Sequence, residues 1–138
     1  TFDSENYFTN NKIHILYSIK NFNLKFILAV VNSKLINFWI KSEFNNSFQV
    51  EINQLEKIPI PKIDFSNKKE KAEHDDLVRL ADKMLKLNKE LQKLDSILDE
   101  DEYKELKSEI DKTDKEIDEK VYKLYGLTPE EIKIIEEK

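Results

Sequence analysis

The sequence predicts an α+β protein: a small mixed α/β head with one core helix and a few strands, followed by a long antiparallel helical hairpin and a short C-terminal helix. The hairpin follows from two apolar seams whose intervals alternate between three and four residues, which is the pattern of one helix face. The strands follow from short stretches rich in β-branched and aromatic residues within the first 60 positions. One Gly and three Pro in 138 residues leave little room for an all-β fold, which needs many turns.

The two seams define the hairpin. The first lies on a helix expected over residues 74–98, about 37 Å long at 1.5 Å per residue. It consists of Leu77, Leu80, Met84, Leu87, Leu91, Leu94 and Leu98. The second follows a short acidic break and consists of Tyr103, Leu106, Ile110, Ile117, Val121 and Leu124, with Thr113 at a position where an apolar residue would continue the pattern. Because two paired helices leave part of each seam uncovered, we expect a third surface to cover them: the rest of the chain, another domain or a second copy.

The head is expected to contain strands around one helix. Residues 12–19 are β-branched and aromatic, and residues 48–53 alternate apolar with polar side chains, so both are predicted as strands. Asn21 or Asn23 can cap the helix between them, whose apolar residues recur from Leu24 to Trp39 and which is expected to end near residues 41–44. Residues 58–61, Ile-Pro-Ile-Pro, are expected to form an edge strand or to leave the sheet, because proline lacks an N–H.

Several polar residues are placed as helix caps. Asp99 and Glu102 have the spacing of a capping box at the start of the second hairpin helix. Gly126, the only glycine, follows the second seam where a helix needs a left-handed residue. Thr128 and Glu131 have the capping-box spacing again, with a proline at the first helical position, so a final short helix is predicted.

Charge is distributed unevenly along the chain. The net charge of −5 divides into roughly +2 over residues 1–62 and −7 over residues 63–138. A polyanion is therefore expected to meet the first part, while the helical part repels it. The absence of Cys favours a reducing interior and a cytoplasmic location. The longest apolar run, residues 26–31, is too short to span a bilayer.

The residues of common catalytic and metal sites are not arranged as such sites. One Gly cannot form a Gly-rich phosphate loop. His14 and His74 lie far apart in sequence and there is no Cys, so no zinc site is expected. Asp75 and Asp76 are interpreted as favourable charges near a helix N-terminus. The chain by itself is therefore expected to be non-catalytic.

Three stretches resemble parts of one protein family. Residues 30–38, Val-Val-Asn-Ser-Lys-Leu-Ile-Asn-Phe, resemble a helix of the TaqI-like C-terminal specificity regions, and residues 55–61, Leu-Glu-Lys-Ile-Pro-Ile-Pro, resemble the segment that follows it there. Residues 117–132, which contain Tyr-Gly-Leu-Thr-Pro, resemble the closing segment of type IIG restriction-modification methylases. The resemblance covers nearly the whole chain.

The resemblance implies a C-terminal piece of an adenine-specific DNA methyltransferase of a restriction-modification system. It divides the chain into a partial target-recognition domain (1–65), a linker (66–73) and the coiled-coil-like hairpin with its C-terminal helix (74–138). In that family another domain binds S-adenosylmethionine and transfers the methyl group. The expected partners are double-stranded DNA, the catalytic domain of the same parent chain and, through the hairpin, a second copy. The family's catalytic Asn-Pro-Pro-Tyr motif is missing here, so the catalytic step cannot be assigned to these residues.

Amide and lysine side chains of the mildly basic part are the candidates for contacting DNA. Asn and Gln can form two hydrogen bonds with adenine, and Lys can meet phosphates. The candidates are Asn10, Asn11, Lys12, Lys20, Lys34, Lys41, Asn45, Asn46 and Gln49. Asn32 lies in the motif that carries the resemblance, but it is expected to bond the backbone rather than a base.

A second interpretation makes the hairpin a coiled-coil interaction module for dimerisation or docking. The specificity subunits of type I restriction systems resemble the chain in this respect, since they join recognition domains to long antiparallel helices after a similar Ile-Pro segment. The Tyr-Gly-Leu-Thr sequence favours the type IIG interpretation.

Overall fold

The computed structural model describes residues 23–44, 55–94 and 99–137. These residues form the helices α1 (Leu24–Asn32), α2 (Lys34–Glu43), α4 (Lys68–Leu91), α5 (Glu100–Leu124) and α6 (Pro129–Glu136), and no strand occurs among them. The prediction of an α+β fold is therefore wrong. Of the segments predicted as strands, 12–19 and 48–53 lie outside the described residues, and 58–61 is irregular because its two prolines cannot donate to a sheet.

The helix expected from residue 24 to residues 41–44 is two helices. Ser33 separates them with an extended backbone (φ −66°, ψ 155°). Its hydroxyl donates to the carbonyl of Val30 (2.7 Å) and accepts the N–H of Ile36 (3.4 Å), so one side chain closes α1 and caps α2. Asn23, one of the two residues predicted as its cap, caps α1 by accepting the N–H of Lys25 at 2.9 Å.

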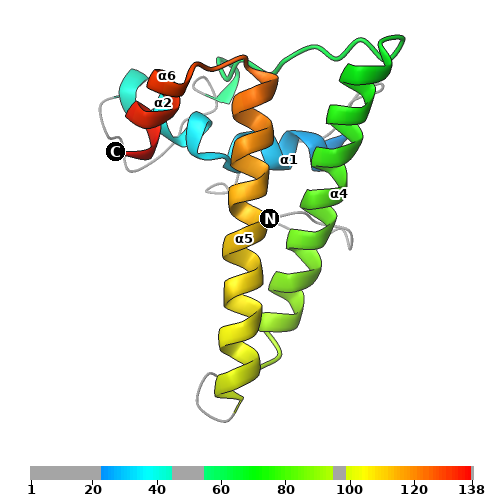
Figure 1. Ribbon diagram of the computed structural model, residues 1–138, viewed down its shortest axis with the longest axis vertical. Coiled ribbons are helices and arrows are strands. Elements are labelled where there is room, and N and C mark those ends of the chain that lie inside the picture. The colour runs from blue at the N-terminus through cyan, green and yellow to red at the C-terminus, as the bar shows by residue number, and fades with distance from the viewer. Residues whose placement is uncertain (1–22, 45–54, 95–98, 138) are drawn as a thin grey trace.

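Helices α4 and α5 lie side by side and run in opposite directions, which confirms the predicted hairpin (Figure 1). Its ion pairs fix the register: Lys83 Nζ lies 2.5 Å from Glu109, and Asp76 lies 2.5 Å from Lys120 Nζ. Helix α4 is shifted from its expected bounds, since it begins at Lys68 within the stretch expected as a linker and ends at Leu91. The interpretation of Asp75 and Asp76 as N-terminal charges is consequently wrong, because both lie beyond the first turn of α4.

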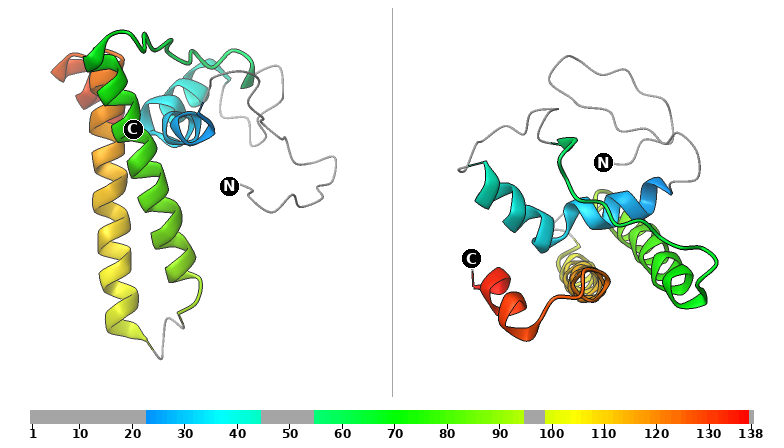
Figure 2. Two further views of the ribbon diagram at one scale, coloured as in Figure 1. Left: turned by 90° about the vertical axis from the view of Figure 1, so that its right-hand side faces the viewer. Right: turned by 90° about the horizontal axis from the view of Figure 1, so that it is seen from above.

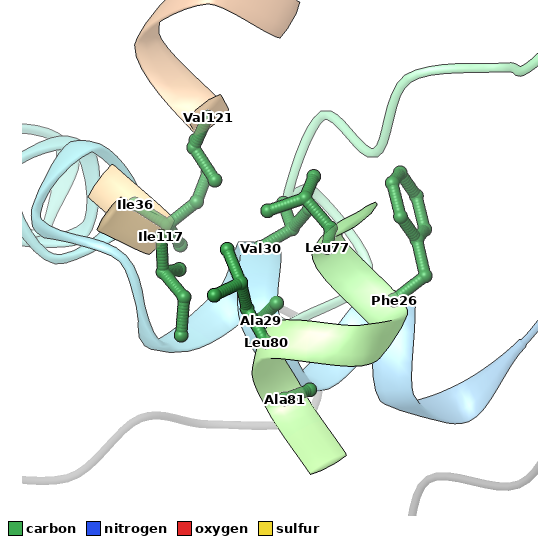
Figure 3. Packing of buried hydrophobic residues seen from close by; sticks show 9 residues of the cluster. All are labelled: Phe26, Ala29, Val30, Ile36, Leu77, Leu80, Ala81, Ile117 and Val121. Atoms are coloured by element: carbon green, nitrogen blue, oxygen red, sulfur yellow. The ribbon is translucent and has the colours of Figure 1, made fainter. Parts of the chain in front are cut away.

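The core lies at one end of the hairpin, which we call the head end: the part of α4 near Leu77 and the part of α5 near Val121. Helix α1 crosses the hairpin there, and α2 continues toward α6 (Figure 2). Side chains from four helices converge in this core (Figure 3). It contains Phe26, Ala29 and Val30 of α1, Ile36 of α2, Leu77, Leu80 and Ala81 of α4, and Ile117 and Val121 of α5. The rest of the chain therefore supplies the third surface that the seams need.

The remote half of the hairpin is less well covered. Leu87 and Leu91 on α4 and Leu106 and Ile110 on α5 are only half-buried, whereas Leu77 and Leu80 are fully buried. Thr113 occupies its seam position in full burial because its hydroxyl donates to the carbonyl of Glu109 at 2.8 Å. A polar residue can thus interrupt the seam without leaving an unsatisfied group.

The C-terminal caps form as predicted. Gly126 has φ 68°, and its N–H donates to the carbonyl of Lys123 (3.1 Å) while the N–H of Leu127 donates to that of Tyr122 (3.0 Å). These two bonds make a Schellman motif. Thr128 and the residue three positions later form both halves of a capping box for α6. At the start of α5, by contrast, the side chain of Asp99 makes no capping hydrogen bond, so the capping box predicted there is wrong.

One buried histidine helps to hold α1 against α4. The ring of His74 lies between Phe26 (ring centroids 4.9 Å apart) and Phe65 (5.0 Å), and its Nδ1 is 2.9 Å from the carboxylate of Asp75. Across residues 23–44, 55–94 and 99–137, no helix combines the length and apolar character that crossing a membrane requires.

Candidate nucleic-acid interface

The three stretches that carry the family resemblance meet at the head end. The turn between α1 and α2 (residues 32–34) rests on α5 and α6, and the Ile-Pro segment (residues 58–61) rests on the end of α5. Residues that are 66 to 102 positions apart in sequence are therefore joined by direct hydrogen bonds. We call the group Lys34, Asp118, Tyr122 and Glu136 the joint.

Lys34 is bound at both its backbone and its side chain. Its N–H donates to Asp118 Oδ1 at 2.8 Å, and its Nζ lies 2.6 Å from Glu136 Oε2. The Tyr122 hydroxyl donates to the other oxygen of Glu136 at 2.7 Å. The bond to Lys34 lowers the pKa of Glu136 and raises that of Lys34, while burial and the bond to Glu136 raise the pKa of Tyr122. Helix α6 is thus tied to α2 through one carboxylate.

Asp118 is the buried member of the joint. Its residue is 3% exposed, and its Oδ2 has no hydrogen-bond partner within the described part of the chain. Desolvation raises the pKa of this carboxyl, and the N–H of Lys34 opposes that effect. Because the N–H at the first position of α2 has no partner within its own helix, Asp118 caps α2 from a different element.

The amide side chains of the turn satisfy backbone groups. Asn32 Nδ2 donates to the carbonyl of Leu28 at 2.8 Å, and Asn37 Nδ2 donates to the carbonyl of Asn32 at 3.3 Å. Asn32 therefore bonds the backbone, as expected from the sequence. The role of this motif in the structure is to shape a helix junction.

The Ile-Pro segment is held by an aromatic hydroxyl. Tyr125 donates to the carbonyl of Pro59 at 2.6 Å, and burial raises the pKa of Tyr125 to about 12. Ile58 and Ile60 are partly buried against the core cluster, together with Ile63. The segment therefore packs against the core without forming a helix or a strand.

Only two of the predicted DNA contacts lie within the described residues. Lys34 belongs to the joint, and Lys41 is exposed in the last turn of α2. Seven lie outside the described residues: Asn10, Asn11, Lys12, Lys20, Asn45, Asn46 and Gln49. The structure tests none of these contacts.

A groove separates α2 from α6 beside the joint. Its volume is about 580 Å³, and it is lined by Lys34, Asn37, Phe38, Lys41, Ser42, Ile135 and Glu136. Lys34 is paired with Glu136 there, so Lys41 contributes most of the positive charge that an anion in this groove would meet. Across the three described ranges, no three His, Asp or Glu side chains are grouped so that they could hold a metal ion.

Comparison with protein families decides what the first part of the chain resembles. Residues 1–60 match the TaqI-like C-terminal specificity domain. This match confirms the resemblance to a TaqI-like specificity region and indicates DNA recognition in a restriction-modification protein. The comparisons with curated proteins and with solved structures found no match.

The matched specificity-domain segment includes α1, α2 and the start of the Ile-Pro segment. Its buried residues pack on Leu77 and Leu80 of α4 and on Val121 of α5, all beyond the match. Sequence reasoning missed Asp118 and Glu136 as partners of the specificity domain. Asp118 directly follows a seam residue, which hints at partial burial, but nothing in its spacing points to Lys34.

Proposed function

We propose that this chain is the DNA target-recognition and helical spacer region of an adenine-specific DNA methyltransferase of a restriction-modification system, of the type IIG class. S-adenosylmethionine binding and methyl transfer belong to a catalytic domain of the same parent chain. The proposal is carried by the match of residues 1–60 to a specificity domain. The resemblance of residues 117–132 to the closing segment of type IIG methylases supports the class.

The packing supports a division of labour between the specificity domain and the hairpin. In this proposal, Lys and amide side chains of the specificity domain contact the duplex. Helices α4 and α5 support that domain through the shared core and the joint. Because the turn at residues 32–34 uses its side chains for the junction, the contacts to bases come from other residues. Among the described residues, Lys41 remains the proposed phosphate contact.

Salt-dependent DNA binding tests this function. Changing Lys12, Lys20 and Lys41 to Glu should weaken duplex binding and flatten the dependence of affinity on salt, because a protein that makes fewer phosphate contacts releases fewer counterions when it binds. The matched control places the same three Lys→Glu changes at a distal set, which consists of Lys86, Lys89 and Lys93. Unchanged affinity across the salt range in the first variant would count against the proposal.

A second candidate function is a protein-interaction module, in which the hairpin dimerises or docks. It is favoured by the half-buried seam residues of the remote half, such as Leu87, Leu91 and Leu106. Mass that increases with protein concentration, together with no retention of DNA, would favour this alternative over the first.

A further inference from the structure

Lysines gather where the connection from the Ile-Pro segment reaches α4. Over residues 57–71 there are five lysines and two acidic residues. Over residues 72–137 there are 12 Lys and Arg against 21 acidic residues. The helical part of the chain is therefore acidic overall, with two basic stretches: this one at the head end, and residues 83–93 in and just after the second half of α4, which hold four lysines and one acidic residue.

The two acids of this stretch are occupied by the turn before α4. Glu70 accepts the N–H of Asp64 (2.8 Å) and the side-chain amide of Asn67 (2.8 Å). Asp64 accepts both the N–H (2.9 Å) and the hydroxyl (2.6 Å) of Ser66, which lowers the pKa of its carboxyl. Both carboxylates thus fix the path of the main chain.

Three of the five lysines, in contrast, make no ion pair within the described part of the chain, whereas Lys57 lies over the ring of Phe44. Lys71 pairs with Asp75 at 2.5 Å, but Lys62, Lys68 and Lys69 are exposed and form no ion pair within the described ranges. Lys68 and Lys69 occupy the first two positions of α4, where the helix macrodipole disfavours a positive charge. Since these lysines oppose a local preference without a compensating contact, folding stability does not explain them.

We propose that Lys62, Lys68 and Lys69 form a second contact with the phosphate backbone of the DNA duplex. This inference rests on the proposed function and extends it beyond the residues that match the specificity domain. The connection crosses the head end of the hairpin, the end on which α1 and α2 also lie (Figures 1 and 2). Lys62 and Lys69 are seven positions apart in sequence, so the set reaches over at most about 25 Å, or roughly seven base pairs.

The test is the salt dependence of duplex binding by the 138-residue chain, measured by fluorescence anisotropy with a labelled duplex between about 50 and 200 mM salt. One variant carries Lys62→Gln, Lys68→Gln and Lys69→Gln. The control carries Lys86→Gln, Lys89→Gln and Lys93→Gln, an equal change of charge at the other end of α4. We expect the first variant to lose about 0.9 of slope per contact, up to about three in total, and roughly tenfold in affinity per contact near 0.1 M salt.

The outcomes separate this inference from the function on which it rests. Equal slopes for the two variants, with the unmodified chain binding DNA, overturn the second contact and leave the proposed function standing. No binding by the unmodified chain at 50 mM salt overturns both. Circular dichroism provides the check on folding: the first variant should melt no lower than the unmodified chain, because it removes positive charge from the positive end of a helix.

Discussion

The carboxylate of Asp118 accepts the backbone N–H of Lys34 at 2.8 Å, across 84 positions of sequence. One oxygen of a buried acid on α5 thus caps α2, a helix within the residues that match the specificity-domain family. The other oxygen has no partner in the described part of the chain. This arrangement holds α2 in place at the cost of burying a charge.

The stability of the chain should record this buried charge as a dependence on pH. The pKa of Asp118 is raised from 3.8 by burial, so its contribution to folding is fully present below about pH 4 and is lost as pH rises through the raised pKa. Asp118→Asn keeps an oxygen for the N–H of Lys34 and does not titrate. We therefore expect the stability of this variant, relative to the unmodified chain, to increase between about pH 4 and pH 7 in urea denaturation.

Asp76 provides the control of opposite sign. Its pKa is lowered, chiefly by its hydrogen bond to Lys120, so its contribution is present at neutral pH and is lost as pH falls through the lowered pKa. Asp76→Asn should therefore be less stable than the unmodified chain at pH 7, with a difference that shrinks toward acid pH. If the two variants showed the same trend, the assignment of Asp118 as a desolvated acid would be wrong.

Truncation of the seam should be costly only where the seam is covered. Leu80 is fully buried against α1, so Leu80→Ala is expected to lower the free energy of unfolding by about 2–5 kcal/mol. Leu87, two turns further along the same seam, is half-buried, so Leu87→Ala should cost below about 2 kcal/mol. Equal losses in chemical denaturation would mean that a further partner covers the remote half in solution.

Ser33 should contribute to stability through its hydroxyl. Ser33→Ala removes both the cap of α2 and the bond to the carbonyl of Val30, and we expect a loss of about 1–2 kcal/mol. Ser42→Ala, on an exposed position of the same helix, is the matched control and should change stability by less than about 0.5 kcal/mol. Thermal melts followed by circular dichroism can compare the two.

Lys34 and Lys41 should differ in their effect on DNA binding, although both were predicted as contacts. Lys41 is exposed and makes no ion pair within the described ranges, so Lys41→Gln should reduce the salt slope by about one. Lys34 is paired with Glu136, and a phosphate would have to displace that carboxylate in order to bind Lys34. Lys34→Gln should therefore leave the slope unchanged and lower thermal stability. A reduced slope for Lys34→Gln would instead make this lysine a direct contact.

Local signals predicted the helical elements well. The seam of α4 as far as Leu91, the seam of α5, the cap at Asn23 and the glycine at position 126 each depend on residues close in sequence, and the structure contains them. The expected continuation of the first seam to Leu94 and Leu98 lies beyond the end of α4, and Leu98 is outside the described residues. The break at Ser33 was missed because apolar spacing continues across it, while the hydroxyl that makes it bonds in both directions. Residues 58–61 were ambiguous because short apolar runs fit several structures.

The interface was less predictable because its partners are distant in sequence. Lys34 could be chosen as a cation, but its pairing with Glu136 spans 102 positions and leaves no periodic trace. The basic stretch near Lys62 was likewise missed, because a count of charge over residues 63–138 averages it with the many acidic residues that follow. Spatial proximity, rather than residue type, decides which lysines are free to meet a phosphate.

The shared core sets where this molecule can be recombined. Phe26 and Val30 pack directly on Leu77 and Leu80, so a crossover near residue 60 would join two surfaces that were not shaped for each other. To exchange sequence preference between related enzymes, one would have to transfer α4, α5 and α6 together with the recognition segment. Chimaeras built at the edge of the matched family segment should aggregate, whereas those that swap the entire unit should remain folded.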